Sequence, residues 1–372
     1  MGKPLKIILV GPATPYRGGI ADTQYLLGKN LKEQGNQVEL WTFTKQYPKL
    51  LFPGKTQLTT DSTPSAVPIH RKIHGFAPWQ WFKVRKELKK AEADIIVFRY
   101  WTPFFALCWM VLAGGLQPST RRIGLVDNWI PHENRFLSVL FNGFFRKSMD
   151  AFMCLSPYVA KQIRKETTKA VDWKYHPLAE QTPAPKEKFQ ARQELHWRTQ
   201  KTIISFVGLI RDYKGLDLLL EALGQLSKDR LAQLELKVGG AFYCSVEPYK
   251  YIIEKLGLEA HVEIRDEFLS SDVLRDYICA ADVVVLPYRR ATQSGIIAQS
   301  MHYQCPLLVT DVGGLADQLQ GYPLGTIVPA TVEDLSRELE QLQPKSTDRK
   351  LRPVEFMNWA VFSKALLQLG SS

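Results

Sequence analysis

Short runs of β-branched and apolar residues alternate with stretches of helical periodicity along the whole chain. In the first half such runs predict strands at 6–10, 37–43, 94–98, 122–126 and 151–155. In the second half they predict strands at 202–207, 235–239, 261–264, 282–286, 306–310 and 326–328. Strands that alternate with helices are typical of parallel sheets with crossover helices. We therefore predict an α/β protein with two Rossmann-like, doubly wound domains that face each other across a cleft.

The 372 residues exceed the usual size of one domain, so two domains are expected. Residues 176–186 are rich in proline and lack periodicity, as in a linker. We predict an amino-terminal domain at 1–180 and a carboxyl-terminal domain at 181–353. Residues 354–372 have apolar positions at helical spacing, and we expect this last helix to pack back toward the first domain.

The charge of the chain is concentrated in its first half. Residues 1–180 hold 26 Lys and Arg against 13 Asp and Glu, and the remainder holds 22 against 24. A basic domain suits nucleic acid, anionic lipid or a phosphorylated substrate. Nucleic acid is the least favoured partner, because no helix-turn-helix, zinc or aromatic-strand signature accompanies the charge.

Five dispersed cysteines fit neither a disulfide framework nor a zinc site. The amino terminus lacks the pattern of a signal peptide, and the longest apolar stretch, 101–116, is too short to cross a bilayer. A cytoplasmic location is expected. The segment 78–90 places Trp79, Trp81 and Phe82 beside Lys and Arg, which suits a helix in a lipid interface and implies an anionic membrane surface as a partner. A surface helix with a buried aromatic face explains the same pattern.

Glycines follow the first predicted strand. Gly18 and Gly19 stand at the start of a helix, where bare backbone amides can approach an anion. The dinucleotide-binding pattern G-x-G-x-x-G is absent, which disfavours an NAD-binding domain. A plain tight turn remains the alternative for this glycine pair.

Three loops of the second half could bind phosphate. Arg211 and Lys214 follow the strand at 202–207 and could clamp a diphosphate, or they are solvated loop charges. Ser294, Gly295 and Ile296 begin an apolar helix after the strand at 282–286 and offer amides and a hydroxyl. A third turn, Gly313-Gly314, follows the strand at 306–310, so all three loops are expected on one sheet edge.

These segments together resemble the carboxyl-terminal domain of retaining glycosyltransferases of family 4. The resemblance rests on 206–222, 280–288, Ser294-Gly295 and 310–314, and it extends to Gly18-Gly19 and to Trp359 in the last helix. It implies a GT-B fold, a nucleotide-sugar donor as co-substrate in the second domain, an acceptor in the first, and no metal or other cofactor. The absence of an Asp-x-Asp motif agrees with the expected lack of a metal.

The chain departs from the family pattern at the donor site. Leu209 stands where the family often has Arg, which leaves Arg211 as the replacement. Two glutamates that contact the donor sugar and ribose in the family are replaced here by Thr292 and Ser300. The resemblance thus implies a site for the sugar and ribose made of the following residues: Thr292, Gln293, Gln299, Ser300, Gly313 and Gly314.

Family members place a functional His near the end of the strand that corresponds to 122–126. Asp127 and Asn128 occupy that position here, and His132 follows. Any of the three could orient the acceptor hydroxyl or accept its proton. Alternatively, Asn128 is a cap and His132 packs in a loop. Arg99, after the strand at 94–98, could bind an acidic acceptor.

The resemblance therefore implies retaining transfer of a sugar to a glycan or lipid-linked acceptor, in the synthesis of cell-surface polysaccharide or glycolipid. The enzyme would be cytoplasmic, or peripheral on the inner face of the plasma membrane. Two alternatives stay open. One is a sugar-nucleotide or lipid-surface binding protein that has lost turnover, and the other is a nucleotide-sugar epimerase of the same fold.

Overall fold

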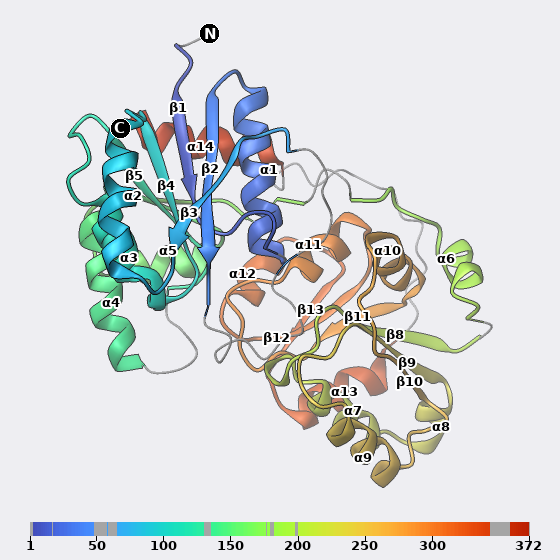
Figure 1. Cartoon of the computed structure of the whole chain (residues 1–372). Coiled ribbons are helices and arrows are strands. Elements are labelled where there is room, and N and C mark those ends of the chain that lie inside the picture. The colour runs from blue at the N-terminus through green and yellow to red at the C-terminus, as the bar shows by residue number, and fades with distance from the viewer. Residues whose placement is uncertain are drawn as a thin grey trace. The chain divides into compact units, whose positions relative to one another are not determined.

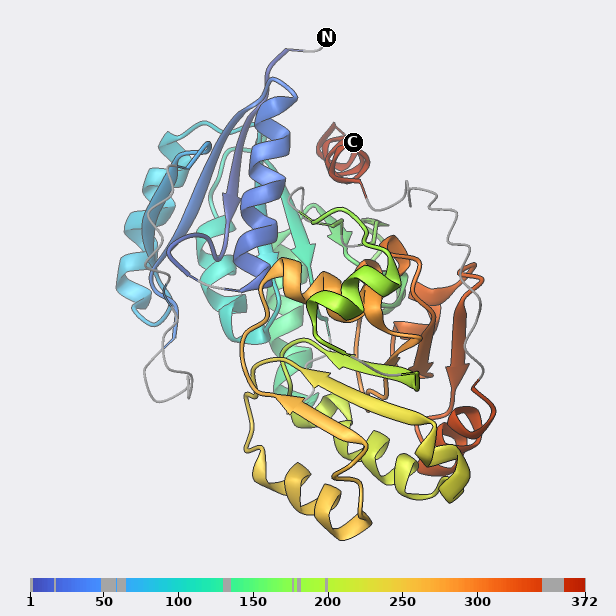
Figure 2. The same cartoon turned by 90° about the vertical axis from the view of Figure 1, so that its right-hand side faces the viewer.

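The computed structural model describes residues 3–16, 18–47, 58, 65–129, 135–175, 177–178, 182–197, 200–342 and 358–371. The chain forms two compact units. Unit 1 comprises Met1–Glu180 and Phe356–Ser372, and unit 2 comprises Gln181–Glu355. Each unit is an α/β layer structure with helices on both faces of a parallel sheet (Figures 1 and 2). The prediction of two Rossmann-like domains is confirmed.

The sheet of unit 1 has seven strands in the order β3-β2-β1-β4-β5-β6-β7, and every neighbouring pair is parallel. Its strands are β1 (Lys6–Val10), β2 (Gln37–Lys45), β3 (Ile69–His74), β4 (Ile95–Tyr100), β5 (Arg121–Val126), β6 (Ala151–Cys154) and β7 (Ala170–Trp173). The five predicted strands are present. The two edge strands, β3 and β7, are not among the predictions.

Alternate residues of these strands point to opposite faces, and both faces are covered. Ile8 and Val10 join one core, under the helices α2 (Pro78–Lys90), α3 (Ala106–Ala113), α4 (Arg135–Ser148) and α5 (Pro157–Arg164). Ile7 and Leu9 join the other, under α1 (Gly19–Glu33) and α14 (Trp359–Ser371). The short helix η2 (Pro103–Phe105) precedes α3, and together they bury much of the apolar stretch 101–116.

The last helix, α14, is part of unit 1. Its Trp359 donates from Nε1 to the carbonyl of Leu178 (2.7 Å), and Ser363 donates to Asn30 Oδ1 on α1 (2.7 Å). The apolar side of α14 is buried against α1 and β5–β7. The chain therefore leaves unit 1, forms unit 2, and returns to complete the first core.

Unit 2 has a six-stranded parallel sheet in the order β10-β9-β8-β11-β12-β13. The strands are β8 (Thr202–Val207), β9 (Leu234–Gly239), β10 (Val262–Arg265), β11 (Val283–Leu286), β12 (Leu307–Thr310) and β13 (Gly325–Val328). All six correspond to predicted strands. All six strands are short. The residues of β8, β9, β11 and β12 are mostly buried, which explains the continuous apolar runs in the sequence.

The helices of unit 2 pack on both faces of this sheet. They are η3 (Asp212–Lys214), α6 (Lys188–Glu194), α7 (Leu216–Gly224), α8 (Lys228–Ala232), α9 (Glu247–Leu256), α10 (Ser271–Ala280), α11 (Gly295–His302), α12 (Leu315–Leu319) and α13 (Val332–Gln341). The leucines of α7 form the centre of one core together with α9 and α13. On the other face, α6 packs against α10. None of the helices in the described ranges of either unit is long and apolar enough to span a membrane.

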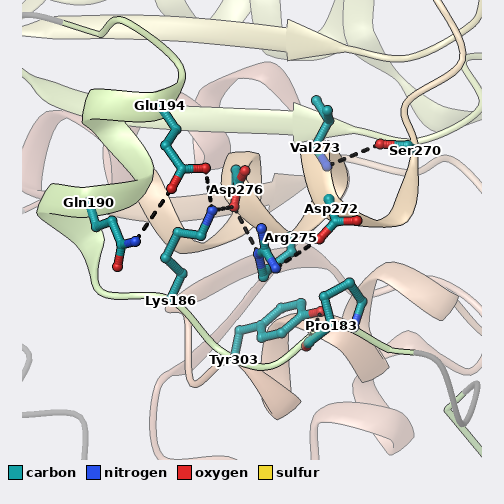
Figure 3. Close-up of polar contacts among 10 residues, drawn as sticks. All are labelled: Pro183, Lys186, Gln190, Glu194, Ser270, Asp272, Val273, Arg275, Asp276 and Tyr303. Atoms are coloured by element: carbon teal, nitrogen blue, oxygen red, sulfur yellow. Dashed lines mark hydrogen bonds and ion pairs between the residues drawn. The ribbon is translucent and has the colours of Figure 1, made fainter.

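Charged side chains fix α6 and the segment before it to α10 (Figure 3). The ammonium of Lys186 contacts Asp276 at 2.9 Å and also pairs with Glu194. Arg275 donates to the same Asp276 carboxylate at 2.8 Å. The hydroxyl of Tyr303 donates to the carbonyl of Pro183 at 3.1 Å. These contacts hold the beginning of unit 2 on its own sheet, and the loops after β8, β11 and β12 are not part of this network.

Candidate functional site

The three loops of unit 2 that are predicted to bind phosphate lie together. Loop 208–215 follows β8, loop 287–294 follows β11, and loop 311–314 follows β12. These strands are neighbours in the order β8-β11-β12 and run parallel, so their carboxyl ends share one edge of the sheet. This edge is where open α/β sheets bind ligands.

The first two loops are joined by backbone and charged contacts. The N–H of Arg289 donates to the carbonyl of Tyr213 (2.8 Å), and the guanidinium of Arg289 forms two 2.7 Å contacts with Asp217. Gly215 has a φ of 68°, and a Cβ there would lie 2.0 Å from the carbonyl oxygen of Pro287. Only glycine fits this approach, so the loop that carries Lys214 is held against the loop after β11.

The second and third loops are joined in the same way. The N–H of Gly314 donates to the carbonyl of Ala291 (3.0 Å). Gly313 has a φ of 59°, and a Cβ there would lie 1.8 Å from that same carbonyl oxygen. The side chain of Gln318 on α12 binds both the N–H and the carbonyl of Ser294 at 2.9 Å. The structure thus brings the predicted phosphate loops into one rigid group.

Lys214 lies inside this group. The residue is 9% exposed, and its Nζ lies 5.4 Å from the ring centroid of Tyr288. It is also 3.4 Å from the position that a Cβ on Gly208 would take. In the part of unit 2 that the structure describes, no carboxylate forms an ion pair with this ammonium. Burial, together with the nearby charge of Arg211, lowers the pKa of Lys214.

Arg211 is the second cation of the group. It is exposed, and its Cζ lies 5.1 Å from the ring centroid of Tyr243. It too has no carboxylate partner among the residues described. Two neighbouring cations without counter-ions destabilise each other, so the arrangement favours binding of an anion between or beside them.

The start of α11 adds a backbone donor. Ser294 is the N-cap of this helix, and its hydroxyl accepts the N–H of Ile296 at 3.3 Å. The backbone N–H of Ile296, which was predicted to bind a ligand, therefore already donates to a group of the protein. Gly295 is exposed, and its N–H has no acceptor among the backbone and side-chain bonds of the described residues. The backbone N–H of Gly295 is therefore the donor of this turn that can bind an anion.

The residues that replace the family's glutamates are less accessible. Thr292 is 9% exposed, and Gln293 and Gln299 are half-buried. Ser300 has no exposed surface, and its Oγ has no hydrogen-bond partner within the described ranges. The geometry therefore gives no support to the predicted ribose contact of Ser300, because a fully buried hydroxyl reaches a ligand only after a change of conformation.

The predicted acceptor residues of unit 1 include a buried ion pair. Arg99 and Asp127 are 1% and 7% exposed, and the guanidinium donates to both carboxylate oxygens at 2.6 Å. Arg99 also donates to Thr23 Oγ1 at 3.2 Å. Arg99 and Asp127 are thus each other's partner in the structure, and the predicted role of each toward an acceptor stays a prediction. Their pairing supports the carboxyl ends of β4 and β5.

The other unit 1 candidates are differently placed. Asn128 is half-buried just after β5. Gly18 and Gly19 begin α1, and a Cβ on either would meet none of the described residues within 4 Å. His132 lies outside the described residues, and its predicted role stays a prediction.

Sequence reasoning missed Gln24, on α1. Its side chain is 1% exposed, yet neither its Oε1 nor its Nε2 has a partner among the described residues. A Cβ on Gly11 would lie 2.8 Å from that Nε2 and 2.7 Å from Arg99 Cβ. The amide thus belongs to the same polar region as the Arg99–Asp127 pair. Gln24 occupies a position on the buried side of the amphipathic helix α1, where the spacing predicts an apolar residue. A polar residue at such a position is the sequence signal that could have identified it.

No group of three or more His, Cys, Asp or Glu side chains in the described ranges could hold a metal ion. At the carboxyl edge of β8 and β11, two cations and the N–H of Gly295 can stabilise negative charge electrostatically. An anionic group with several oxygens, such as a diphosphate, matches these donors in charge and number.

Two family models match the chain. "Glycosyltransferase Family 4" covers residues 17–170, and "Glycosyl transferases group 1" covers residues 201–343. The chain belongs to the family 4-like glycosyltransferases. The first match falls in unit 1 and the second in unit 2, so the resemblance noted from the loop motifs is confirmed on both sides of the linker.

Curated relatives of this glycosyltransferase share short stretches with it. The D-inositol 3-phosphate glycosyltransferase of Segniliparus rotundus is 27% identical over 151 residues, 39% of this chain and 33% of the relative. The enzyme of the same name from Corynebacterium glutamicum is 28% identical over 131 residues, 34% of this chain and 31% of the relative. The matches span about a third of each relative.

Solved structures align with the glycosyltransferase over nearly its whole length. Sucrose-phosphate synthase from Thermosynechococcus elongatus has a TM-score of 0.70 at 15% identity and covers 98% of both chains. WaaG, a glycosyltransferase involved in lipopolysaccharide biosynthesis, has a TM-score of 0.65 at 18% identity, with 97% of this chain and 95% of WaaG covered. Anabaena HepE in complex with UDP-glucose has a TM-score of 0.66 at 15% identity, with 98% and 97% covered. At these identities the likeness establishes the GT-B fold.

Proposed function

We propose that this glycosyltransferase moves a sugar from a nucleotide-sugar donor to a glycan or lipid-linked acceptor, with retention of configuration and without a metal. The donor diphosphate binds at Lys214, Arg211 and the N–H of Gly295. We further propose a role in cell-surface polysaccharide or glycolipid synthesis at the cytoplasmic side of the membrane.

The observation that carries the proposal is the buried ammonium of Lys214 without a carboxylate partner. A buried cation is unfavourable unless it is paired, so the ligand is expected to supply the counter-charge. In transfer, the bond between the sugar C1 and the diphosphate oxygen breaks, and a bond from C1 to the acceptor oxygen forms. The negative charge that develops on the departing diphosphate is stabilised by Lys214, Arg211 and the amide dipole at Gly295.

Retention brings the acceptor hydroxyl to the same face of the sugar that the diphosphate leaves. The departing phosphate oxygen is then the nearest base for the hydroxyl proton. Asp127, which accepts hydrogen bonds from Arg99 at both of its oxygens, keeps its proposed role at the acceptor. Asn128 and His132 keep their proposed role of orienting the acceptor.

The comparisons support the class of donor and acceptor. Anabaena HepE was solved with UDP-glucose, which makes UDP-glucose the first donor to test. The names of other relatives point to acceptors that are phosphorylated polyols or lipopolysaccharide. The excess positive charge of residues 1–180 agrees with an anionic acceptor.

A second candidate is a sugar-nucleotide binding protein without turnover. It is favoured by the loss of both donor-contacting glutamates and by the complete burial of Ser300. An epimerase of the same fold would instead convert the donor with no acceptor present.

Incubation with a panel of sugar nucleotides, with and without a lipid extract and with a metal chelator throughout, tests the proposal. We expect release of the nucleoside diphosphate only with acceptor, and its loss in Arg211→Ala and Lys214→Ala. Lys228→Ala, an exposed lysine of the same unit, is the matched control and should retain full turnover. Binding without release favours the second candidate, and conversion of the donor alone favours the epimerase. Full activity of Lys214→Ala would refute the assigned diphosphate site.

A further inference from the structure

The helix α2 has two opposite faces. Trp81, Val84 and Leu88 are buried, and Trp81 donates from Nε1 to the carbonyl of His74 at 2.7 Å. Trp81 is therefore a core residue and is not available to lipid, contrary to the interpretation that placed all three aromatics of this segment in an interface. Trp79 and Phe82 are 73% and 54% exposed, and they lie on the other face.

Further exposed apolar side chains lie in the first halves of the neighbouring helices. Phe104 of η2 is 43% exposed, and Val139 and Leu140 of α4 are 70% and 55% exposed. The ring of Phe104 lies 4.7 Å from that of Phe76, directly before α2, and η2 also contacts α4. α2, α3 and α4 lie side by side on one face of the unit 1 sheet (Figure 1). α2, η2 and α4 each follow a parallel strand, so these side chains lie toward the carboxyl edge.

Uncompensated positive charge continues this surface along α2. Lys83, Lys86, Lys89 and Lys90 are exposed, and none forms an ion pair with an acidic side chain of the described ranges. Positions 79, 82, 83, 86 and 90 follow helical spacing, so two aromatics and three of the lysines share one side. We call Trp79, Phe82, Phe104, Val139, Leu140 and these four lysines the aromatic–lysine face.

We propose that the aromatic–lysine face docks onto the surface of an anionic lipid bilayer. Aromatic rings prefer the boundary between headgroups and acyl chains, and lysines at such a boundary extend their ammonium groups to anionic headgroups. A second copy of the chain fits poorly, because a two-fold contact would bring the same lysines against each other. The inference concerns a partner beyond the proposed reaction, and it does not require turnover.

Co-sedimentation of the full chain with lipid vesicles tests the docking without reference to donor or acceptor. We expect binding to phosphatidylcholine vesicles that contain phosphatidylglycerol and much weaker binding to phosphatidylcholine alone. Lys83→Gln/Lys86→Gln should weaken binding by about 25-fold, since each lysine near an anionic surface contributes about fivefold. Trp79→Ser/Phe82→Ser should weaken it by about tenfold or more. All four side chains are exposed, so these variants should fold normally.

Matched controls lie in unit 2. Phe189 is 73% exposed, like Trp79, and Lys228 and Lys255 are exposed lysines. Phe189→Ser and Lys228→Gln/Lys255→Gln should leave vesicle binding unchanged. The inference is overturned if the chain does not bind anionic vesicles, or if the control variants lose as much binding as the face variants. It is also overturned if the face variants instead abolish a concentration-dependent dimer seen by sedimentation in the absence of lipid.

Discussion

Replacing Lys214 by methionine should stabilise the ligand-free protein and weaken donor binding at the same time. Methionine keeps most of the volume of the lysine stem and removes a buried charge without a counter-ion. Burial lowers the pKa of Lys214, so the charged ammonium destabilises the folded state relative to the unfolded chain. Between the lowered pKa and the ordinary value the unfolded chain binds more protons. This lysine therefore makes the wild-type chain more stable as pH rises through that window, and the variant should lose this slope.

The size of both effects follows from the contacts of the ammonium. Desolvation of a polar group that lacks a partner is unfavourable by about 1–3 kcal/mol. The cation–π interaction of the ammonium with the ring of Tyr288, at 5.4 Å, offsets part of this free energy. A net gain of about 1 kcal/mol in the free energy of unfolding is expected, which raises Tm by about 2–4 °C for a unit of this size. Removing one side of a buried charge contact with the diphosphate should weaken UDP binding by about 2–4 kcal/mol, roughly 30- to 900-fold.

The assay is thermal unfolding with and without UDP, followed by calorimetric titration of UDP at neutral pH. Wild type should have the lower Tm alone and the larger upward shift with UDP. Lys228→Met is the control, because that lysine is exposed in the same unit, and neither quantity should change. A variant of Lys214 that is less stable than wild type and binds UDP normally would refute the reasoning on both counts.

Three further predictions concern other parts of the structure and can be tested by chemical unfolding. Gly313→Ala should lower stability by about 2–4 kcal/mol through a backbone clash, whereas Gly257→Ala, at φ 65° in open space, should lower it by about 1 kcal/mol; equal losses would contradict the close approach. Arg99→Met should cost about 3–5 kcal/mol, and adding Asp127→Leu should recover most of it, so an additive further loss would argue against the buried pair. Asp282 is buried, but hydrogen bonds from Lys188 and from the backbone N–H of Ile203, together with the charges of Lys188 and Arg192, lower its pKa. Its stabilisation is therefore complete above about pH 4 and is lost as pH falls through the lowered pKa, and Asp282→Asn should flatten stability in that acid range.

Much of the fold followed from the apolar pattern, and the exceptions have a physical reason. Strands buried on both faces, such as β8 and β11, appear in the sequence as continuous apolar runs. The edge strands β3 and β7 have few buried positions and carry charged residues, so their sequences, IHRKIH and AVDW, lack such a run. Their place in the sheet depends on pairing with β2 and β6, which is a long-range property.

The positions of the candidate site loops were predictable, because these loops follow adjacent parallel strands. Contacts between side chains were less predictable where they depend on the register of two neighbouring strands. The strand order places the loops of Lys214, Ser294 and Gly313 on one edge. Arg99 and Asp127 are 28 residues apart, and their pairing arises because β4 lies beside β5 with Tyr100 opposite Val126. Periodicity gives no information on such partners, and so both residues looked available for an acceptor.

The return of α14 to unit 1 has a consequence for biosynthesis. Unit 1 lacks the helix that covers part of one face of its sheet until residues 359–371 have been made. During translation, the apolar surface around Leu27 and Ile123 therefore stays uncovered while unit 2 is synthesised and folds on its own sheet. A premature stop between unit 2 and α14 would release a chain with a complete second domain and an aggregation-prone first domain that lacks its covering helix.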